Sequence, residues 1–154
     1  MRLVERGRPD EAEKAGVVSL DWWGRLLKVR RGEVVLTTGM AQQQLEQGQV
    51  LRQMGRNEEA RGLVRVAHEG LKEALEAYPT GHSSTNLRCA EAAIELAELG
   101  EPAEGGGAEA WLAEAEKVLV RPRSGRERLT PGLRELLAGL EKRLAELRPG
   151  VAGR

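Results

Sequence analysis

Cysteine and aromatic residues are scarce in this chain of 154 residues. Cys89 is the single cysteine, so no disulfide can form within the chain, which favours a reducing compartment such as the cytoplasm. There are three Trp, one Tyr and no Phe. The core must therefore be built from Leu, Val and Ala, a composition that suits closely packed helices.

The sequence also lacks an excess of either charge and any long apolar run. Lys plus Arg and Asp plus Glu are both 24, so the formal net charge is zero. A dedicated nucleic-acid or membrane-surface binder would show a basic excess. No apolar run approaches the ~18 residues of a membrane helix, and the charged N-terminus is unlike a signal peptide. We expect one cytoplasmic domain, or an excised piece of a longer chain, that binds neither nucleic acid nor membrane.

Helical periodicity is clear from residue 41 onward. Apolar residues recur three or four apart, and Gly or Pro separates the segments. The predicted fold is all-α: antiparallel helical hairpins stacked in a short array with a C-terminal capping helix. We expect the repeat domain to span 41–148 and the tail 149–154 to be frayed. The predicted helices cover 41–54, 58–78, 84–99, 108–120 and 130–147.

Residues 1–40 are less regular, and we expect a helical or irregular segment there. A helix beginning at Pro9 and Asp10 should weaken at Gly16, and Asp21 should cap a second helix over 22–31. The β-branched stretch 33–38 is compatible with a short strand. A strand needs a partner, however, and no clear second one exists in the sequence.

Three related short sequence segments suggest that a structural unit is repeated along the chain. They are GRPDEA from Gly7, MGRNEEA around Gly55 and LGEPAEG around Gly100. The glycines lie 48 and 45 residues apart, a spacing typical of helical-repeat arrays.

The first hairpin resembles the tetratricopeptide repeat. Six residues fall on that family's signature positions with allowed types: Gly48, Leu51, Gly55, Ala60, Val64 and Ala67. Gln44 and Lys72 depart from it, since the family prefers Trp and Pro there. The second hairpin matches less well, and its +4, +3 spacing fits only if the Gly-rich turn holds three extra residues. The matching residues there are Ala93, Leu96, Gly100, Ala108, Leu112 and Ala115.

A second resemblance covers the order of elements after residue 58. The long helix, the Tyr-Pro-Thr-Gly-His connector from Tyr78, the helix ending in Leu-Gly and the leucine-rich end resemble the C-terminal helical region of SET and MYND domain lysine methyltransferases. They also resemble the longer repeats of kinesin light chains. The single cysteine cannot supply MYND zinc ligands, so this resemblance implies at most an accessory region of such an enzyme.

Residues that could carry chemistry have simpler explanations. We expect His68 at the surface, His82 in a connector and Cys89 as a buried thiol, because neither histidine has a ligand partner at i+3 or i+4. The sequence thus predicts no metal site, no cofactor and no enzyme activity. We expect a flexible turn at 105–107, a core anchor at Trp22-Trp23 and a solvated loop around four arginines: Arg121, Arg123, Arg126 and Arg128.

The leading hypothesis is a non-enzymatic interaction scaffold that binds a peptide or a partner helix. By analogy with tetratricopeptide repeats, the first helix of each hairpin would line the groove. The rivals are an accessory region of a larger enzyme and a structural homo-oligomer. The expected groove residues are Gln42, Leu45, Glu46, Gln49, Arg52 and Gln53 in the first hairpin, and Leu87, Ala90, Glu91, Ile94 and Glu98 in the second.

Overall fold

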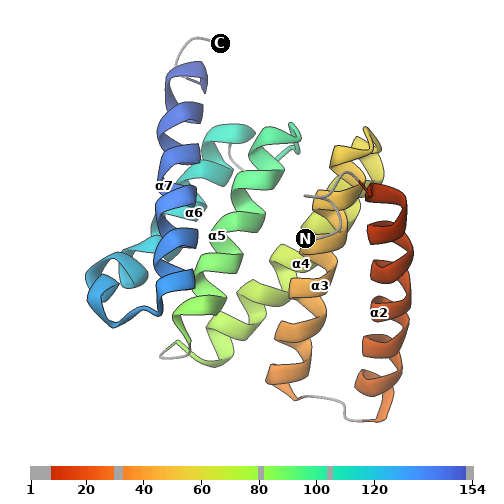
Figure 1. Cartoon of the computed structure of the whole chain (residues 1–154). Helices are drawn as coiled ribbons and strands as arrows, with labels where there is room; N and C mark the ends of the chain where they lie inside the picture. The colour runs from red at the N-terminus through yellow and green to blue at the C-terminus, as the bar shows by residue number, and fades with distance from the viewer. Residues whose placement is uncertain (1–7, 30–32, 80–81, 104–105, 152–154) are drawn as a thin grey trace. The chain divides into compact units, whose positions relative to one another are not determined.

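The computed structural model describes residues 8–29, 33–79, 82–103 and 106–151. All regular structure in these residues is helical, and they contain no strand, so the predicted all-α class is confirmed (Figure 1). The elements are α2 (Pro9–Val29), α3 (Val34–Gln53), α4 (Asn57–Ala77), α5 (Ser83–Glu98), α6 (Ala108–Ser124), the 3₁₀ turn η1 (Arg126–Arg128) and α7 (Pro131–Val151).

The chain divides into two compact units, unit 1 (Met1–Pro79) and unit 2 (Thr80–Arg154). We expected the division at residue 40, but residues 40 and 41 are consecutive in α3. The frayed tail expected over 149–154 does not begin at 149, because α7 continues to Val151; residues 152–154 lie outside the described residues.

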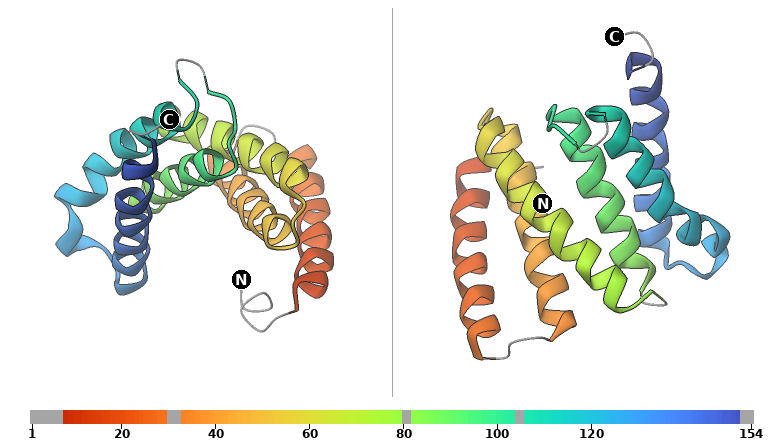
Figure 2. Two further views of the ribbon diagram at one scale, coloured as in Figure 1. Left: turned by 90° about the horizontal axis from the view of Figure 1, so that it is seen from above. Right: turned by 180° about the vertical axis from the view of Figure 1, so that it is seen from behind.

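In unit 1, α3 packs against both α2 and α4 (Figure 2). The α2–α3 pair is antiparallel. Ser19 Oγ donates to Gln43 Oε1 at 2.9 Å, and Gln47 Nε2 donates to the carbonyl of Glu13 at 3.3 Å. The Trp23 ring lies against Gly39, where a β-carbon would come within 2.4 Å of it. These contacts fix how α2 sits on α3.

The helix expected to weaken at Gly16 instead continues through it as α2. Gly16 is buried against Gln47, and a β-carbon at residue 16 would lie 1.6 Å from the Gln47 side-chain oxygen. This close packing keeps the helix continuous despite the glycine. Asp21 caps no helix, because it lies inside α2 and pairs with Arg25 at 2.8 Å.

The β-branched stretch that was compatible with a strand begins α3 instead. The Glu33 carbonyl accepts hydrogen bonds from the backbone N–H groups of Leu36 and Thr37 at 3.0 and 3.1 Å. A strand at 33–38 would need a partner strand, and the described residues contain none. The backbone N–H and C=O groups of this stretch therefore form their hydrogen bonds within a helix.

The α3–α4 hairpin closes as the sequence predicts. Gly55 has φ +76°, and the N–H groups of Gly55 and Arg56 bond to the carbonyls of Arg52 and Leu51, both at 2.9 Å. This is a Schellman motif, which satisfies the last carbonyls of a helix. Arg56 then binds Glu13 of α2 and Glu59 of α4, so the turn is also tied to both flanking helices.

The two helices of this hairpin lie close together at Gly48. A β-carbon there would lie 2.5 Å from Val64 Cγ2 and 3.2 Å from the Ala60 carbonyl oxygen. Ala60 and Val64 are fully buried. The expected close crossing of Gly48 and Ala60 is therefore confirmed.

In unit 2, α5 packs against α6 and α7. The turn after α5 repeats the Schellman motif: Gly100 has φ +67°, and the N–H of Glu101 bonds to the Leu96 carbonyl at 2.9 Å. The leucine pattern of α7 supplies the core as predicted. The most buried members of this core are Leu87, Ala90, Ala93, Ile94, Leu112, Ala115, Leu119, Leu137, Leu140 and Leu144.

α6 runs four residues past the expected end at Val120 and contains Pro122. Proline has no N–H, so the carbonyl of Val118, four residues earlier, loses its helical donor. Asn86 Nδ2 of α5 donates to that carbonyl at 3.2 Å. The buried proline is thus tolerated because a side chain from the neighbouring helix replaces the missing bond.

Candidate functional site

A row of polar side chains runs along the face of α3 that lies between its α2-facing and α4-facing sides. We call the residues Gln42, Glu46, Gln49 and Gln53 the α3 row, since their spacing of +4, +3 and +4 places them on one side of the helix. Gln42 Nε2 donates to Glu46 Oε1 at 3.2 Å. Gln42 and Glu46 are half-buried, Gln53 is exposed and Gln49 is buried.

The structure separates the predicted unit 1 residues into two groups. Gln42, Glu46, Arg52 and Gln53 retain surface that a partner can contact. Leu45 is fully buried and Gln49 is only 7% exposed, so these two residues do not line an open surface. The neighbouring Gln43 and Gln47 form hydrogen bonds with α2. The glutamines of α3 therefore lie on two sides of the helix, one facing α2 and one carrying the α3 row.

The predicted groove residues of unit 2 are largely not at a surface. Leu87, Ala90 and Ile94 are fully buried in the core shared with α6 and α7, so their assignment to a groove is wrong. The physical reason is that α5 has two neighbours in this unit, and its apolar side is used against them.

The acidic members of that prediction form ion pairs, with Glu91 buried and Glu98 half-buried. Glu91, which is 5% exposed, pairs with Arg88 at 2.7 Å. Glu98 pairs with Arg143 of α7 at 2.8 Å, and Glu95 pairs with the same guanidinium at 2.9 Å. Burial opposes the charge of Arg143, but these two carboxylates outweigh it and raise the pKa of the guanidinium. The cluster fastens α7 to α5.

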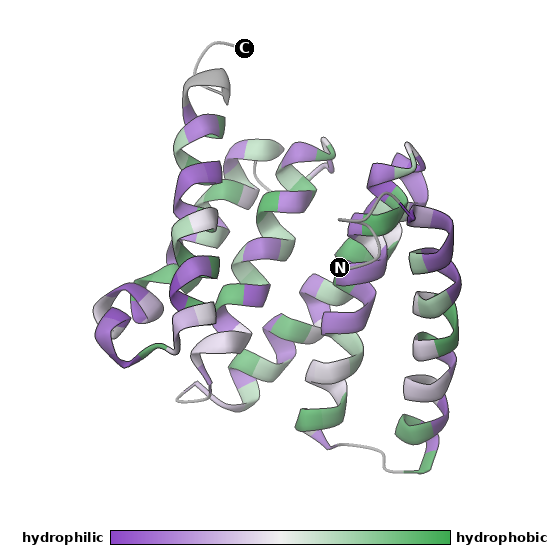
Figure 3. Cartoon of the chain, in the orientation of Figure 1, coloured by the Kyte–Doolittle hydropathy of each residue, from purple (hydrophilic) through white to green (hydrophobic). Residues whose placement is uncertain are grey.

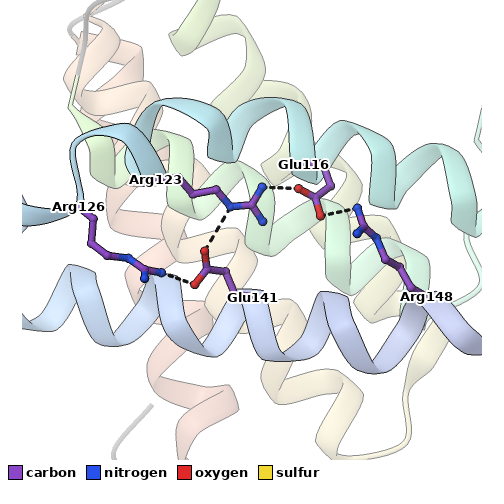
Figure 4. Close-up of polar contacts among 5 residues, drawn as sticks. All are labelled: Glu116, Arg123, Arg126, Glu141 and Arg148. Carbon is purple, nitrogen blue, oxygen red and sulfur yellow. Dashed lines mark hydrogen bonds and ion pairs between the residues drawn. The ribbon is translucent and has the colours of Figure 1, made fainter.

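The basic residues expected in a solvated loop lie at the end of α6 and in η1. Two of them, Arg123 and Arg126, belong to an ion-pair network (Figure 4). Arg123 of α6 binds Glu116, and its Nε lies 3.2 Å from Glu141 of α7. Arg126 binds Glu141, and Arg148 Nη2 lies 2.7 Å from Glu116. The hydrogen bond from Arg123 lowers the pKa of Glu116 against the opposing effect of burial. These arginines neutralise glutamates of unit 2 and join α6 to α7.

The candidate metal ligands do not converge. His68 is 5% exposed, so the expectation of a surface histidine is wrong, because its side of α4 is buried with Ala67 and Leu71. His82 is exposed just before α5, and Cys89 is a fully buried thiol, as predicted. Within the described ranges, no group of three or more His, Cys, Asp or Glu could hold a metal ion.

Unit 2 contains an open pocket of about 670 Å³ between the end of α5, the start of α6 and the end of α7. Leu112 and Leu147 contribute its apolar wall, and four glutamates reach it: Glu98, Glu101, Glu109 and Glu146. The glycine turn predicted at 105–107 lies beside it, with Gly106 and Gly107 at positive φ, whereas residue 105 lies outside the described residues.

Sequence reasoning missed the exposure of Trp22. Trp23 packs on Gly39 as an anchor, but Trp22 is 56% exposed on the outer side of α2. Val18 and Val29 are exposed on the same side, and Figure 3 shows apolar positions along this helix between polar ones. The spacing Val18, Trp22, Val29 (+4, +7) was the available signal.

Comparison with protein-family models, with curated proteins and with solved structures finds no match for this chain. In the part that the structure describes, no helix is both long and apolar enough to cross a membrane. A function must therefore be argued from the geometry of the two units.

Proposed function

We propose that this chain is a non-enzymatic protein-interaction module, and that unit 1 binds an extended peptide or a partner helix along the α3 row. The observation that carries the proposal is the position of that row on a helix held between two neighbours. A partner would meet side chains whose backbone is already ordered, which reduces the entropy cost of binding.

The chemistry of the α3 row suits a peptide ligand. Gln53, the exposed glutamine of the row, offers an acceptor oxygen and two donor hydrogens, and can therefore pair with a peptide C=O and N–H together. Glu46 adds one negative charge beside Gln42, and half-buried Arg52 adds a positive one nearby. Such a mixed surface favours hydrogen-bonded recognition over a purely apolar contact.

The packing of the α3–α4 hairpin supports the proposal that the interaction module is tetratricopeptide-like. Gly48 lies at a close approach of α3 and α4, Ala60 and Val64 are buried opposite it, and Gly55 supplies the positive φ of the turn. Small residues at a crossing and a glycine at the turn are what stacked helical hairpins need. The cytoplasmic location inferred from the single cysteine belongs to the same proposal.

A photo-crosslinking residue placed at position 53 tests this function in the intact chain. Gln53 is exposed at the end of the α3 row, and Glu69 is exposed on α4, away from it. With the same residue at position 69 as control, we expect position 53 alone to capture a defined protein from cell extract. That protein, once purified, must bind the unmodified chain. Equal capture at the two positions would contradict the proposal.

A further inference from the structure

The pocket of unit 2 lies where the end of α5, the start of α6 and the end of α7 meet (Figure 1). Its volume of about 670 Å³ is typical of pockets that bind organic groups. Leu112 and Leu147 form its apolar wall, and Leu112 belongs to the buried core of the unit. Trp111 Nε1 donates to the Glu101 carbonyl at 3.0 Å, which ties the chain after α5 to α6. The walls of the pocket are therefore held by packed helices.

Negative charge predominates around this pocket. Among the described residues that line it, four are acidic and none is basic. Glu98 is paired with Arg143 at 2.8 Å, but the same guanidinium also binds Glu95 at 2.9 Å. One positive charge is thus shared by two carboxylates, which leaves an excess of negative charge at this edge of the pocket.

Two of the four glutamates, Glu109 and Glu146, are exposed and accessible to a ligand. Glu109 forms no ion pair with any of the described residues. Glu146 lies 3.9 Å from Lys142, and because both side chains are exposed this pair contributes little. The negative end of α5 and the positive end of α6 both lie at the pocket and offset each other, so the glutamates determine its charge.

Charge, size and the apolar wall together define the chemistry of a ligand. Within the described part of unit 2, no three of these carboxylates are grouped closely enough to hold a metal ion. They instead border a space large enough for an organic cation, whose aliphatic part can cover Leu112 and Leu147. Arginine and lysine side chains have this form, since each carries a charged head on an aliphatic stem that packs on apolar surface.

We propose that this pocket binds an arginine or lysine side chain of a partner peptide. Glu109 and Glu146 would attract the charged head, and the aliphatic stem would lie on the apolar wall. Because the pocket is open, a small free amine would stay largely hydrated in it, whereas a peptide gains further contacts outside it. The site lies in unit 2 and is independent of the α3 row, which lies in unit 1.

Selection from a displayed library of random peptides tests this proposal with the intact chain. Peptides that also bind the Glu109→Lys variant are removed first, and this step discards any that bind the α3 row. We expect the remaining binders to share a basic residue. Replacing that residue in the best synthetic peptide by its neutral isostere, citrulline for arginine or acetyl-lysine for lysine, should weaken binding at least about tenfold. Glu146→Gln should weaken it about threefold, and added salt should weaken it further.

Glu135→Gln is the matched control, because Glu135 is exposed on α7 about three helical turns before Glu146 and does not line the pocket. It should leave peptide affinity unchanged, and circular dichroism should show that all variants remain helical. Failure to select a binder, binders without a shared basic residue, or equal affinity of the neutral peptide would overturn the proposal.

Two other occupants of the pocket would also overturn it. One is a free amine, shown by spermidine binding as tightly as the best peptide. The other is a second copy of this chain, shown by a dimer in sedimentation analysis that Glu109→Lys abolishes. Experiments on the α3 row change residues of unit 1, so their failure would leave these results unaffected.

Discussion

At residue 48 the chain has no room for a β-carbon. In Gly48→Ala that atom would lie 2.5 Å from Val64 Cγ2, and valine has few alternative rotamers in a helix. We expect the free energy of unfolding to fall by about 1–3 kcal/mol despite the better helix propensity of alanine. Gly62→Ala is the matched control, because nothing lies within 4 Å of its β-carbon position. It should stabilise by about 0.5–1 kcal/mol. Urea unfolding curves in which both substitutions stabilise would refute the close crossing.

The hydrogen bond from Asn86 to the Val118 carbonyl leads to a second prediction about single residues. Asn86→Leu should cost about 1–3 kcal/mol, because it leaves that carbonyl without its donor. In a Pro122→Ala background the new N–H at residue 122 can serve the carbonyl, so the same substitution should cost at least about 1 kcal/mol less. A double-mutant cycle by chemical denaturation measures this difference. Strict additivity of the two substitutions would show that Asn86 does not compensate for the proline.

The structural role of a single residue was predictable where local backbone geometry alone determines that role. Gly55 was placed correctly because a helix end followed by a polar turn favours a residue with positive φ. Asn86 was not noticed, since its partner lies 32 residues away and belongs to another helix. Trp22 and Trp23 are adjacent in sequence, yet only the packing of α3 decides which of them is exposed.

At the scale of elements, the ion-pair network between α6 and α7 predicts acid sensitivity. The pKa of Glu116 is lowered in the folded state, chiefly by its hydrogen bond from Arg123. Its contribution is therefore present above the usual carboxyl pKa of 4.5 and is lost as pH falls through the lower folded value. Glu116→Gln should cost about 0.5–1 kcal/mol at neutral pH, a modest amount because solvent reaches the half-buried network and screens its charges.

The difference between Glu116→Gln and the unaltered chain should vanish at a pH below both pKa values. Thermal unfolding across a pH series measures it. Glu135→Gln is the control, since Glu135 is exposed on α7 and forms no ion pair with any of the described residues. A constant difference between the Glu116 variant and the unaltered chain at every pH would show that its charge is not what matters.

Helix positions followed from apolar periodicity, whereas several helix ends did not. The order of helices after residue 41 was predicted, and the leucine spacing of α7 identified its buried side. The weakening expected at Gly16 and the end expected at Val120 were both wrong. In each case a contact with another helix overrides local propensity: Gln47 packs on Gly16, and Asn86 serves the carbonyl that Pro122 frees.

At the scale of the whole molecule, helical periodicity predicted the all-α class, and a core composed of Leu, Val and Ala agrees with it. The candidate site was predicted only in part. Periodicity shows which residues share a helix face, but not whether another helix covers that face. For α3 the predicted face keeps accessible polar groups, whereas for α5 it is the buried side of a core.

The measurement that tests the central claim most directly is the affinity of a partner captured at position 53 for two charge-reversal variants. Glu46→Lys alters the α3 row, and Glu69→Lys makes the same change on exposed α4. We expect isothermal titration calorimetry to show Glu46→Lys binding at least about fivefold more weakly, the effect of losing about 1 kcal/mol at an interface. Glu69→Lys should bind as the unaltered chain does. Equal affinities for all three proteins would contradict recognition through the α3 row.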